Sequence, residues 1–143
     1  PIGPHPHVVI APPDHPLARA DPALPQDLLA ETFLAREPGS GTRILMTRFL
    51  DRIGDGTPWR MVEMGTNETI KQAVIAGLGV ALISQHTVTE ELRSGRLVAL
   101  RANGLPIQRN WFLIRREDMA LSPAGQRVHD HVLALGGSFL PRL

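Results

Sequence analysis

The chain contains the stretch Thr32-Phe33-Leu34-Ala35-Arg36-Glu37-Pro38-Gly39-Ser40-Gly41-Thr42-Arg43, in which a strand breaks and a helix begins. Its first four residues are part of an apolar run typical of a buried strand, and a helical pattern continues from Thr42 to Ile53. The first backbone N–H groups of a helix lack partners and carry partial positive charge, which attracts anions. The stretch therefore predicts a strand-to-helix turn that faces a small anion.

A second junction of the same kind follows. The run Trp59–Met64 predicts a strand, and Thr66-Asn67-Glu68 precedes a helix whose apolar residues recur at helical spacing. Such a tripeptide is by itself more often a helix cap than a binding site, but it lies at the end of a strand, where open α/β sheets bind ligands. Glu68 either orients a ligand hydroxyl or favours the helix dipole. Ser84, at the end of the apolar run Gly79–Ser84, has the same two interpretations.

Strands and helices alternate along the rest of the chain. We expect strands at 7–11, 31–36, 59–64, 79–84, 97–100 and 110–114, and helices at 21–29, 42–53, from about 66, 87–93 and 122–135. The first helix would start at Asp21-Pro22, and Val128, Val132 and Leu135 would mark the buried face of the last. This alternation predicts a mainly parallel sheet with helices on both faces, with 79–84 as a buried parallel strand.

The composition excludes several classes of protein. Of 143 residues, 43% are hydrophobic and 20% charged, which predicts a folded domain with a core. The net charge is only +1, the basic residues are scattered and the aromatic content is 4%, so direct nucleic-acid binding is not expected. The absence of cysteine excludes disulfides and thiolate metal sites. No membrane span or signal peptide is visible, which favours a cytoplasmic location, and the start at Pro1 suggests a fragment.

No motif for chemistry can be assembled. Gly39-Ser40-Gly41 lacks the third glycine of the dinucleotide fingerprint, the Lys of the P-loop and the pattern of the nucleophile elbow. The six histidines show no zinc-ligand spacing and favour a structural interpretation. The mix of Ser40, Thr42 and Arg43 at a positive helix end favours ligand binding over a plain turn. We therefore predict a binding domain with no catalytic residue, metal or cofactor, and not an enzyme.

Two stretches resemble the signatures of a known family. Arg36–Arg43 resembles the E-x-G-S-G-T-R segment of LysR-type transcriptional regulators, and Glu63–Ser84 resembles the second signature of that family. His15-Pro16-Leu17-Ala18 matches the family's H-P-L-A segment. Gly104-Leu105-Pro106-Ile107, followed by Trp111-Phe112, is most similar to the branch that controls carbon-fixation (Calvin-cycle) operons.

This resemblance implies an α/β fold of the type 2 periplasmic-binding-protein class, with mostly parallel sheets flanked by helices. Residues 31–100 would form a nearly complete second lobe. Residues 1–30 would be a partial first lobe and crossover, and 101–143 would return to the first lobe with a C-terminal helix. The family's N-terminal winged helix-turn-helix, its linker helix and the opening units of its first lobe have no counterpart in this sequence.

The resemblance also implies an effector cleft between the lobes. The ligand contacts that it implies are Ser40, Gly41, Thr42, Arg43, Thr66, Asn67, Glu68 and Ser84. The effector would be a small anionic metabolite, since effectors of this branch are typically phosphorylated metabolites or nucleotides. The domains would pair as dimers within a tetramer, and DNA would be bound only through the helix-turn-helix. The alternatives are a periplasmic-type solute-binding protein for a small anionic ligand, and then an enzyme on the same fold.

Overall fold

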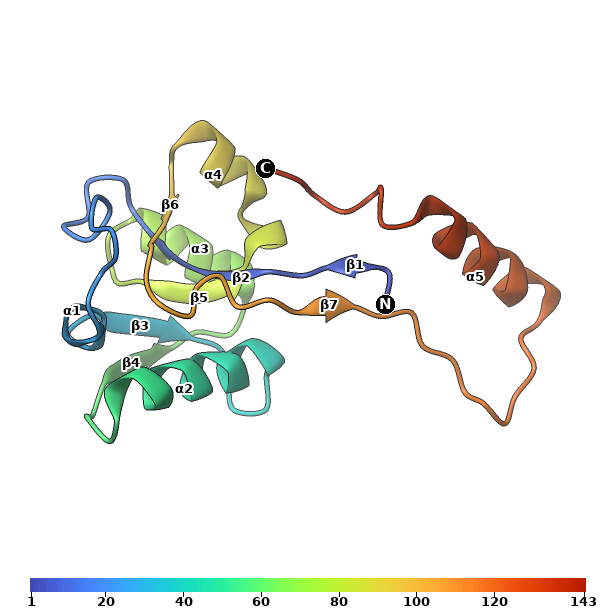
Figure 1. Ribbon diagram of the computed structural model, residues 1–143, viewed down its shortest axis with the longest axis horizontal. Coiled ribbons are helices and arrows are strands. Elements are labelled where there is room, and N and C mark those ends of the chain that lie inside the picture. Colours follow the sequence, from blue (N-terminus) through green and yellow to red (C-terminus); the bar gives the residue numbers. More distant parts are fainter.

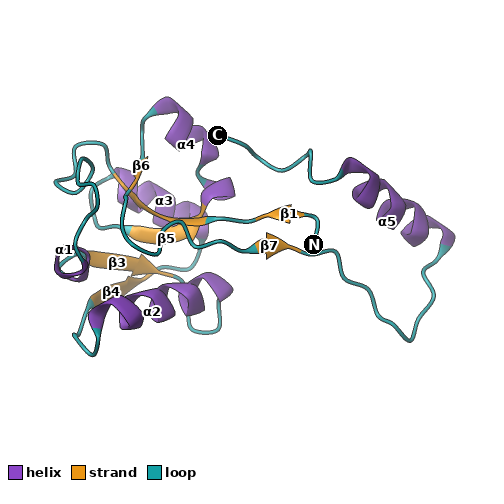
Figure 2. Ribbon diagram, in the orientation of Figure 1, coloured by secondary structure: helices purple, strands orange, loops and turns teal.

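The computed structural model describes all 143 residues, and Figure 1 shows a body of strands and helices from which the extended segment with β7 leads to a separate helix. Strands and helices alternate through the body (Figure 2). The strands are β1 (Gly3–Pro4), β2 (His7–Ala11), β3 (Thr32–Ala35), β4 (Arg60–Glu63), β5 (Ala81–Ser84), β6 (Val98–Ala99) and β7 (Asn110–Trp111). The helices are α1 (Pro25–Leu29), α2 (Gly41–Gly54), α3 (Asn67–Ile75), α4 (Thr89–Ser94) and α5 (Pro123–Leu135), with a 3-10 turn, η1, at Gln85–Thr87.

The strand directions correct one expectation. Among the strand ladders only that of β3 and β4 is parallel, whereas β2 pairs antiparallel with both β5 and β6, and β1 pairs antiparallel with β7. A parallel bridge between Phe33 and Val80 joins the two groups, so the strands follow the order β4-β3-β5-β2-β6. The run 79–84 is thus buried as expected, but its strand is mostly antiparallel. A continuous apolar run indicates that a strand is buried on both faces. It does not specify whether the neighbouring strands are parallel or antiparallel.

Helices cover both faces of these strands, as the alternation predicts. Because successive side chains of a strand point to opposite faces, Val9 packs into one cluster, with Phe33 and Phe49, beside α1 and α2. Its neighbour Ile10 packs into the other cluster, with Val74 of α3. This two-sided core holds the starts of α2 and α3 at the end of the strands where the candidate site lies.

Residues 7–30 share this core with residues 31–100. Ala11, Ala23 and Leu28 belong to the same cluster as Phe33, and β2 is the central strand between β5 and β6. The expected division at residue 30 therefore does not coincide with a gap in the packing. Ile107 also packs against this cluster, so the body extends from about residue 7 to about residue 107.

The first helix starts later than predicted. Leu24 is its N-cap and Pro25 occupies the first turn, so the helix does not begin at Asp21-Pro22. The carboxylate of Asp21 instead accepts a hydrogen bond from Arg101 at 3.0 Å. Both Pro22 and Pro25 fit a first helical turn, and the structure uses the second.

The C-terminal helix lies apart from the body beyond the segment that carries β7, and the chain after it returns to the body beside α4 (Figure 1). Its Ser122 cap and its end at Gly136 agree with the sequence prediction. No residue of α5 is buried, and Val128 is 62% exposed, so the predicted buried face is not covered here. The preceding strand is also shorter than expected, because only Asn110–Trp111 find a partner, in β1. No helix is long and apolar enough to span a bilayer.

Candidate functional site

The N-terminal end of α2 borders a small cavity at the edge of the body, which we call the histidine chamber. Its volume is about 310 Å³. It is lined by His5, His7, Thr42, Asn67, Ser84, His86, Thr87 and Trp111. Three of the eight predicted ligand contacts, Thr42, Asn67 and Ser84, are therefore brought together from α2, α3 and β5. Both strand-to-helix junctions therefore border the same cavity.

Each of these three side chains is held by local structure. Thr42 lies in the first turn of α2, which follows Ser40 as the N-cap. Asn67 begins α3, and its Oδ1 accepts a hydrogen bond from Arg36 Nη1 at 3.1 Å. Ser84 ends β5, and its Oγ accepts a hydrogen bond from the backbone N–H of His86 at 3.2 Å. The chamber is therefore walled by two helix N-termini and a strand end, which together favour an anionic or polar ligand.

The other predicted contacts lie outside the histidine chamber. Gly41 borders an adjoining cavity, and Ser40 lines neither cavity and makes no side-chain cap hydrogen bond. The Arg43 guanidinium donates to the backbone oxygen of Arg36 at 2.7 Å and lies 3.6 Å from Glu63, which ties it to the strand ends.

Thr66 and Glu68 have structural partners on α3. The Thr66 hydroxyl accepts from the backbone N–H of Thr69 at 3.0 Å, which makes Thr66 the cap of α3. Glu68 pairs with Lys71 at 2.9 Å, and this hydrogen bond, with a second from Gln72, lowers the pKa of its carboxyl group. Thr66 is thus a helix cap, one of the two interpretations left open for this tripeptide, whereas the pairing of Glu68 with Lys71 was not among those considered for Glu68.

Sequence reasoning missed a cluster of histidines in the chamber. His5 stacks on Trp111 with 3.9 Å between ring centroids, and His5 lies 4.4 Å from His7 and 5.5 Å from His86. His5 Nε2 lies 2.8 Å from Ser84 Oγ. The two-residue spacing of His5 and His7 at the start of a strand was the available signal, since residues two apart share a face. Nothing in the sequence indicates that His86 and Trp111 join them.

Burial and neighbouring cations disfavour charge on these rings. Burial lowers the pKa of His5 to about 4, with further contributions from His7, His86 and Arg109. Burial likewise lowers the pKa values of His7 and His86. At neutral pH the cluster is therefore uncharged, and its ring nitrogens act as neutral donors and acceptors. No group of three or more histidine, aspartate or glutamate side chains in the structure is arranged to hold a metal.

A larger cavity, which we call the arginine chamber, adjoins the first. Its volume is about 570 Å³, and it shares His5, His7, Thr42 and Trp111 with the histidine chamber. Its remaining lining includes Gly41, Ile44, Leu45, Arg48, Arg109, Asn110 and Phe112. Neither chamber is lined by an aspartate or glutamate, so both carry positive or neutral groups only.

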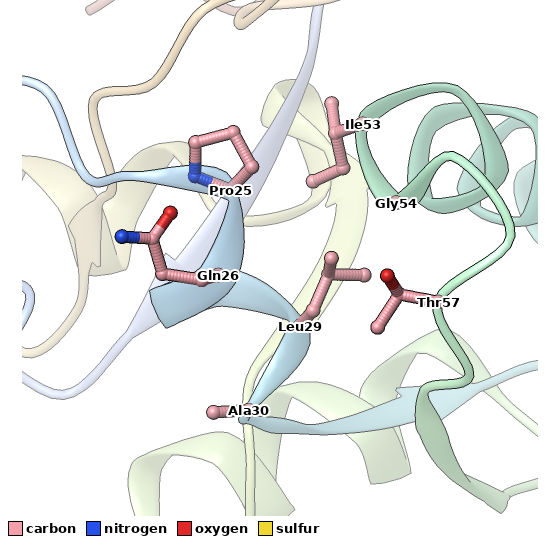
Figure 3. Close-up of a pocket in the computed structure, with 7 residues that line it drawn as sticks. All are labelled: Pro25, Gln26, Leu29, Ala30, Ile53, Gly54 and Thr57. Atoms are coloured by element: carbon pink, nitrogen blue, oxygen red, sulfur yellow. The ribbon is translucent and has the colours of Figure 1, made fainter.

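A third hollow, of about 410 Å³, lies between α1 and the C-terminal end of α2. Figure 3 shows its seven lining residues, which include Pro25, Leu29, Ile53 and Thr57 and no charged side chain. It is at the opposite end of α2 from Thr42 and contains none of the predicted contacts. The two chambers at the N-terminal end of α2 are therefore the candidate site.

The fold and this site define a small-molecule-binding domain of the type 2 periplasmic-binding-protein class. The family model for the LysR substrate binding domain matches residues 1–136. The chain therefore belongs to the LysR substrate-binding-domain family.

Relatives within this family are transcriptional regulators. The chain is 56% identical over 140 residues to the HTH-type transcriptional regulator CbbR of Cereibacter sphaeroides, covering 98% of this chain and 45% of that protein. It is 45% identical over 130 residues to the RuBisCO operon transcriptional regulator of Allochromatium vinosum, covering 91% of this chain and 43% of that protein. The chain thus spans less than half the length of these two relatives.

Solved structures show the same fold. The CcmR regulatory domain of Synechocystis PCC6803, solved in complex with 2-PG, superposes with a TM-score of 0.87 at 35% identity, over 97% of this chain and 66% of that one. The effector binding domain of QuiR, in complex with shikimate, gives a TM-score of 0.77 at 20% identity over 98% of this chain and 65% of that one, a likeness of fold alone.

Proposed function

We propose that this chain is part of the effector-sensing domain of a LysR-type regulator of carbon-fixation operons, and that it binds a small anionic metabolite at the two chambers. The observation that carries this proposal is the convergence of Thr42, Asn67 and Ser84 on one cavity without a carboxylate. Support for the anionic ligand comes from the CcmR domain, at 35% identity, which was solved with 2-PG. A phosphorylated metabolite fits two helix N-termini and the neighbouring Arg48 and Arg109.

The body from about residue 7 to residue 107 would be one lobe of this domain. The segments that carry β1 and β7 would cross to the other lobe, to which α5 would belong. A ligand held between the lobes would change the angle between them, and so the spacing of DNA-binding segments in the intact oligomer. This model includes pairing of the domains as dimers within a tetramer, DNA contact through a helix-turn-helix elsewhere in the protein, a cytoplasmic location and no catalytic activity.

Removing one hydroxyl tests the proposed ligand site. Thr42→Val keeps the shape of the side chain, and its loss of one hydrogen bond to an anion should weaken binding about tenfold. The measurement is calorimetric titration of the complete regulator with 2-PG, sugar phosphates and nucleotides.

Thr57→Val is the matched control, because Thr57 lines the hollow at the other end of α2. It should bind as the unaltered protein does. If Thr42→Val and the unaltered protein bind every anion equally well, the assigned site is wrong.

A further inference from the structure

The hydrogen bonds of His7 specify which of its ring nitrogens carries hydrogen. His7 Nδ1 lies 3.2 Å from the backbone oxygen of His5. A carbonyl oxygen can only accept, so Nδ1 must be the donor, and in the neutral ring Nε2 then holds a lone pair. No buried side-chain nitrogen or oxygen in the structure lacks a partner, yet Nε2 of His7 makes no hydrogen bond. This atom is therefore not completely buried, although His7 is only 4% exposed, and His7 lines both chambers.

His86 has the opposite polarity. The indole Nε1 of Trp111 donates to His86 Nδ1 at 3.1 Å, so Nδ1 is an acceptor and the neutral ring carries its hydrogen on Nε2. Thr42 also offers a hydroxyl hydrogen to the same chamber. A carboxylate, sulfate or phosphate oxygen needs a hydrogen-bond donor. The lone pair on Nε2 of neutral His7 cannot donate, so it does not suit an anion site.

The groups around His7 explain why it is neutral without an anion. His5 lies on the segment before β2, His86 on η1 and Arg109 just before β7. Burial lowers the pKa of His7 most, the hydrogen bond to the His5 backbone oxygen raises it, and the charge of Arg109, with that of His86 when it is protonated, lowers it further. Arg48 on α2 faces the adjoining chamber, and no carboxylate lines either chamber. A bound anion would supply the missing negative charge, and an opposite charge within a few ångströms favours the protonated ring.

We propose that an anion binds these chambers together with a proton, which His7 takes up at Nε2, so that affinity for anions rises as the pH falls. Protonation turns the open lone pair into a charge-assisted donor aimed at the ligand. The inference rests on the proposed function, since it concerns regulation of the same site.

The direction of the pH dependence of anion affinity follows from the linkage between proton uptake and anion binding. In the protein without a bound anion, His7 is neutral at pH 7, because its pKa lies below the ordinary histidine value of 6.5. A bound anion raises that pKa, so protons are taken up while the pH lies between the free and bound values. In that window each linked proton strengthens binding by up to about tenfold per pH unit decrease.

Sulfate is a suitable probe, because its charge does not change over this range. The complete regulator is titrated with sulfate by calorimetry at about pH 6 and about pH 7.5, in two buffers that differ in heat of ionisation, bracketing the ordinary histidine pKa. We expect uptake of up to about one proton per site and binding roughly tenfold tighter at the lower pH.

His7→Gln should abolish the proton uptake and flatten the pH dependence, because an amide cannot titrate. His131→Gln is the matched control, since His131 lies on α5, away from the chambers. It should retain both effects. If His7→Gln fails to fold, the imidazole nitrogen NMR signals of the unaltered protein give the same answer, as Nε2 of His7 should shift to a protonated value when sulfate is added.

The inference is overturned if sulfate affinity is equal at both pH values without proton uptake, if sulfate does not bind at the lower pH, or if the Nε2 signal of His7 is unchanged by bound sulfate. In each of these cases the proposed function survives when 2-PG or another phosphorylated metabolite still binds and Thr42→Val weakens it. If no anion binds at either pH, both fail together.

Discussion

Thr66 and Asn67 are neighbours in the sequence with different roles at the start of α3. The Thr66 hydroxyl accepts from the backbone N–H of Thr69 and lies 2.9 Å from the Thr69 hydroxyl, so it faces the helix. The Asn67 side chain lines the histidine chamber and is held by Arg36. Thr66 therefore stabilises the helix that presents Asn67, and its own side chain is not required to contact the ligand.

Thr66→Ala should lower the free energy of unfolding by about 1 kcal/mol, because the Thr69 N–H loses its acceptor. Urea denaturation of the variant and the parent protein measures this difference. Thr57→Ala is the control, since Thr57 is exposed and caps no helix, and its effect should be within about 0.5 kcal/mol. A Thr66→Ala protein with unchanged stability and no binding of 2-PG would instead place Thr66 among the ligand contacts.

At the scale of elements, the junction between β3 and β5 depends on Gly79. The backbone N–H of Val80 donates to Thr32 at 3.0 Å, and Leu34 donates to Val80 at 2.8 Å. A Cβ atom on Gly79 would lie 2.5 Å from the Thr32 oxygen and 3.1 Å from the Leu34 side chain. The close approach that joins the parallel pair to the antiparallel strands therefore needs a residue without a side chain.

Gly79→Ala should destabilise the body by about 2 kcal/mol, because the added methyl group must push β3 and β5 apart. Thermal and urea unfolding of this variant measure the loss. Gly65→Ala is the matched control, since a Cβ there meets nothing within 4 Å, and it should change stability by less than about 0.5 kcal/mol. Equal stability of the two variants would show that β3 and β5 do not approach as described.

At the scale of the whole molecule, packing is unevenly distributed. The body contains both core clusters, whereas α5 contributes no buried residue to either. The β7 segment, which pairs antiparallel with β1, leads from the body to α5, and the C-terminal tail leads back to α4. Amide protection should follow this distribution, because local opening requires least energy where few apolar contacts must be broken.

In the 143-residue chain, amides of α5 should exchange with deuterium orders of magnitude faster than those of β2 and β5. Hydrogen exchange followed by mass spectrometry measures this contrast, and α3 serves as an internal control, as a helix whose Ile70 and Val74 are buried. Protection of α5 equal to that of β2 would mean that it packs against the body or against another copy of the chain.

The sequence by itself determined the local structure. The positions of α2, α3 and α5, the Ser122 cap and the strand-to-helix turns at residues 36–43 and 63–68 follow from periodicity, capping and glycine placement, which act over a few residues. The gathering of Thr42, Asn67 and Ser84 in one chamber was also predictable, since helices that follow neighbouring strands begin at the same edge.

Only the tertiary structure decided which partners these elements meet. Hydrophobicity reports that the run 79–84 is buried, but its antiparallel pairing with β2 depends on how the whole sheet is assembled. His5 and Ser84 are 79 positions apart, and His86 and Trp111 reach them from two further segments, so no local pattern indicates the histidine cluster. The neutral state of these histidines comes from this convergence, because burial and electrostatic interactions depend on distance in space and not on distance along the chain.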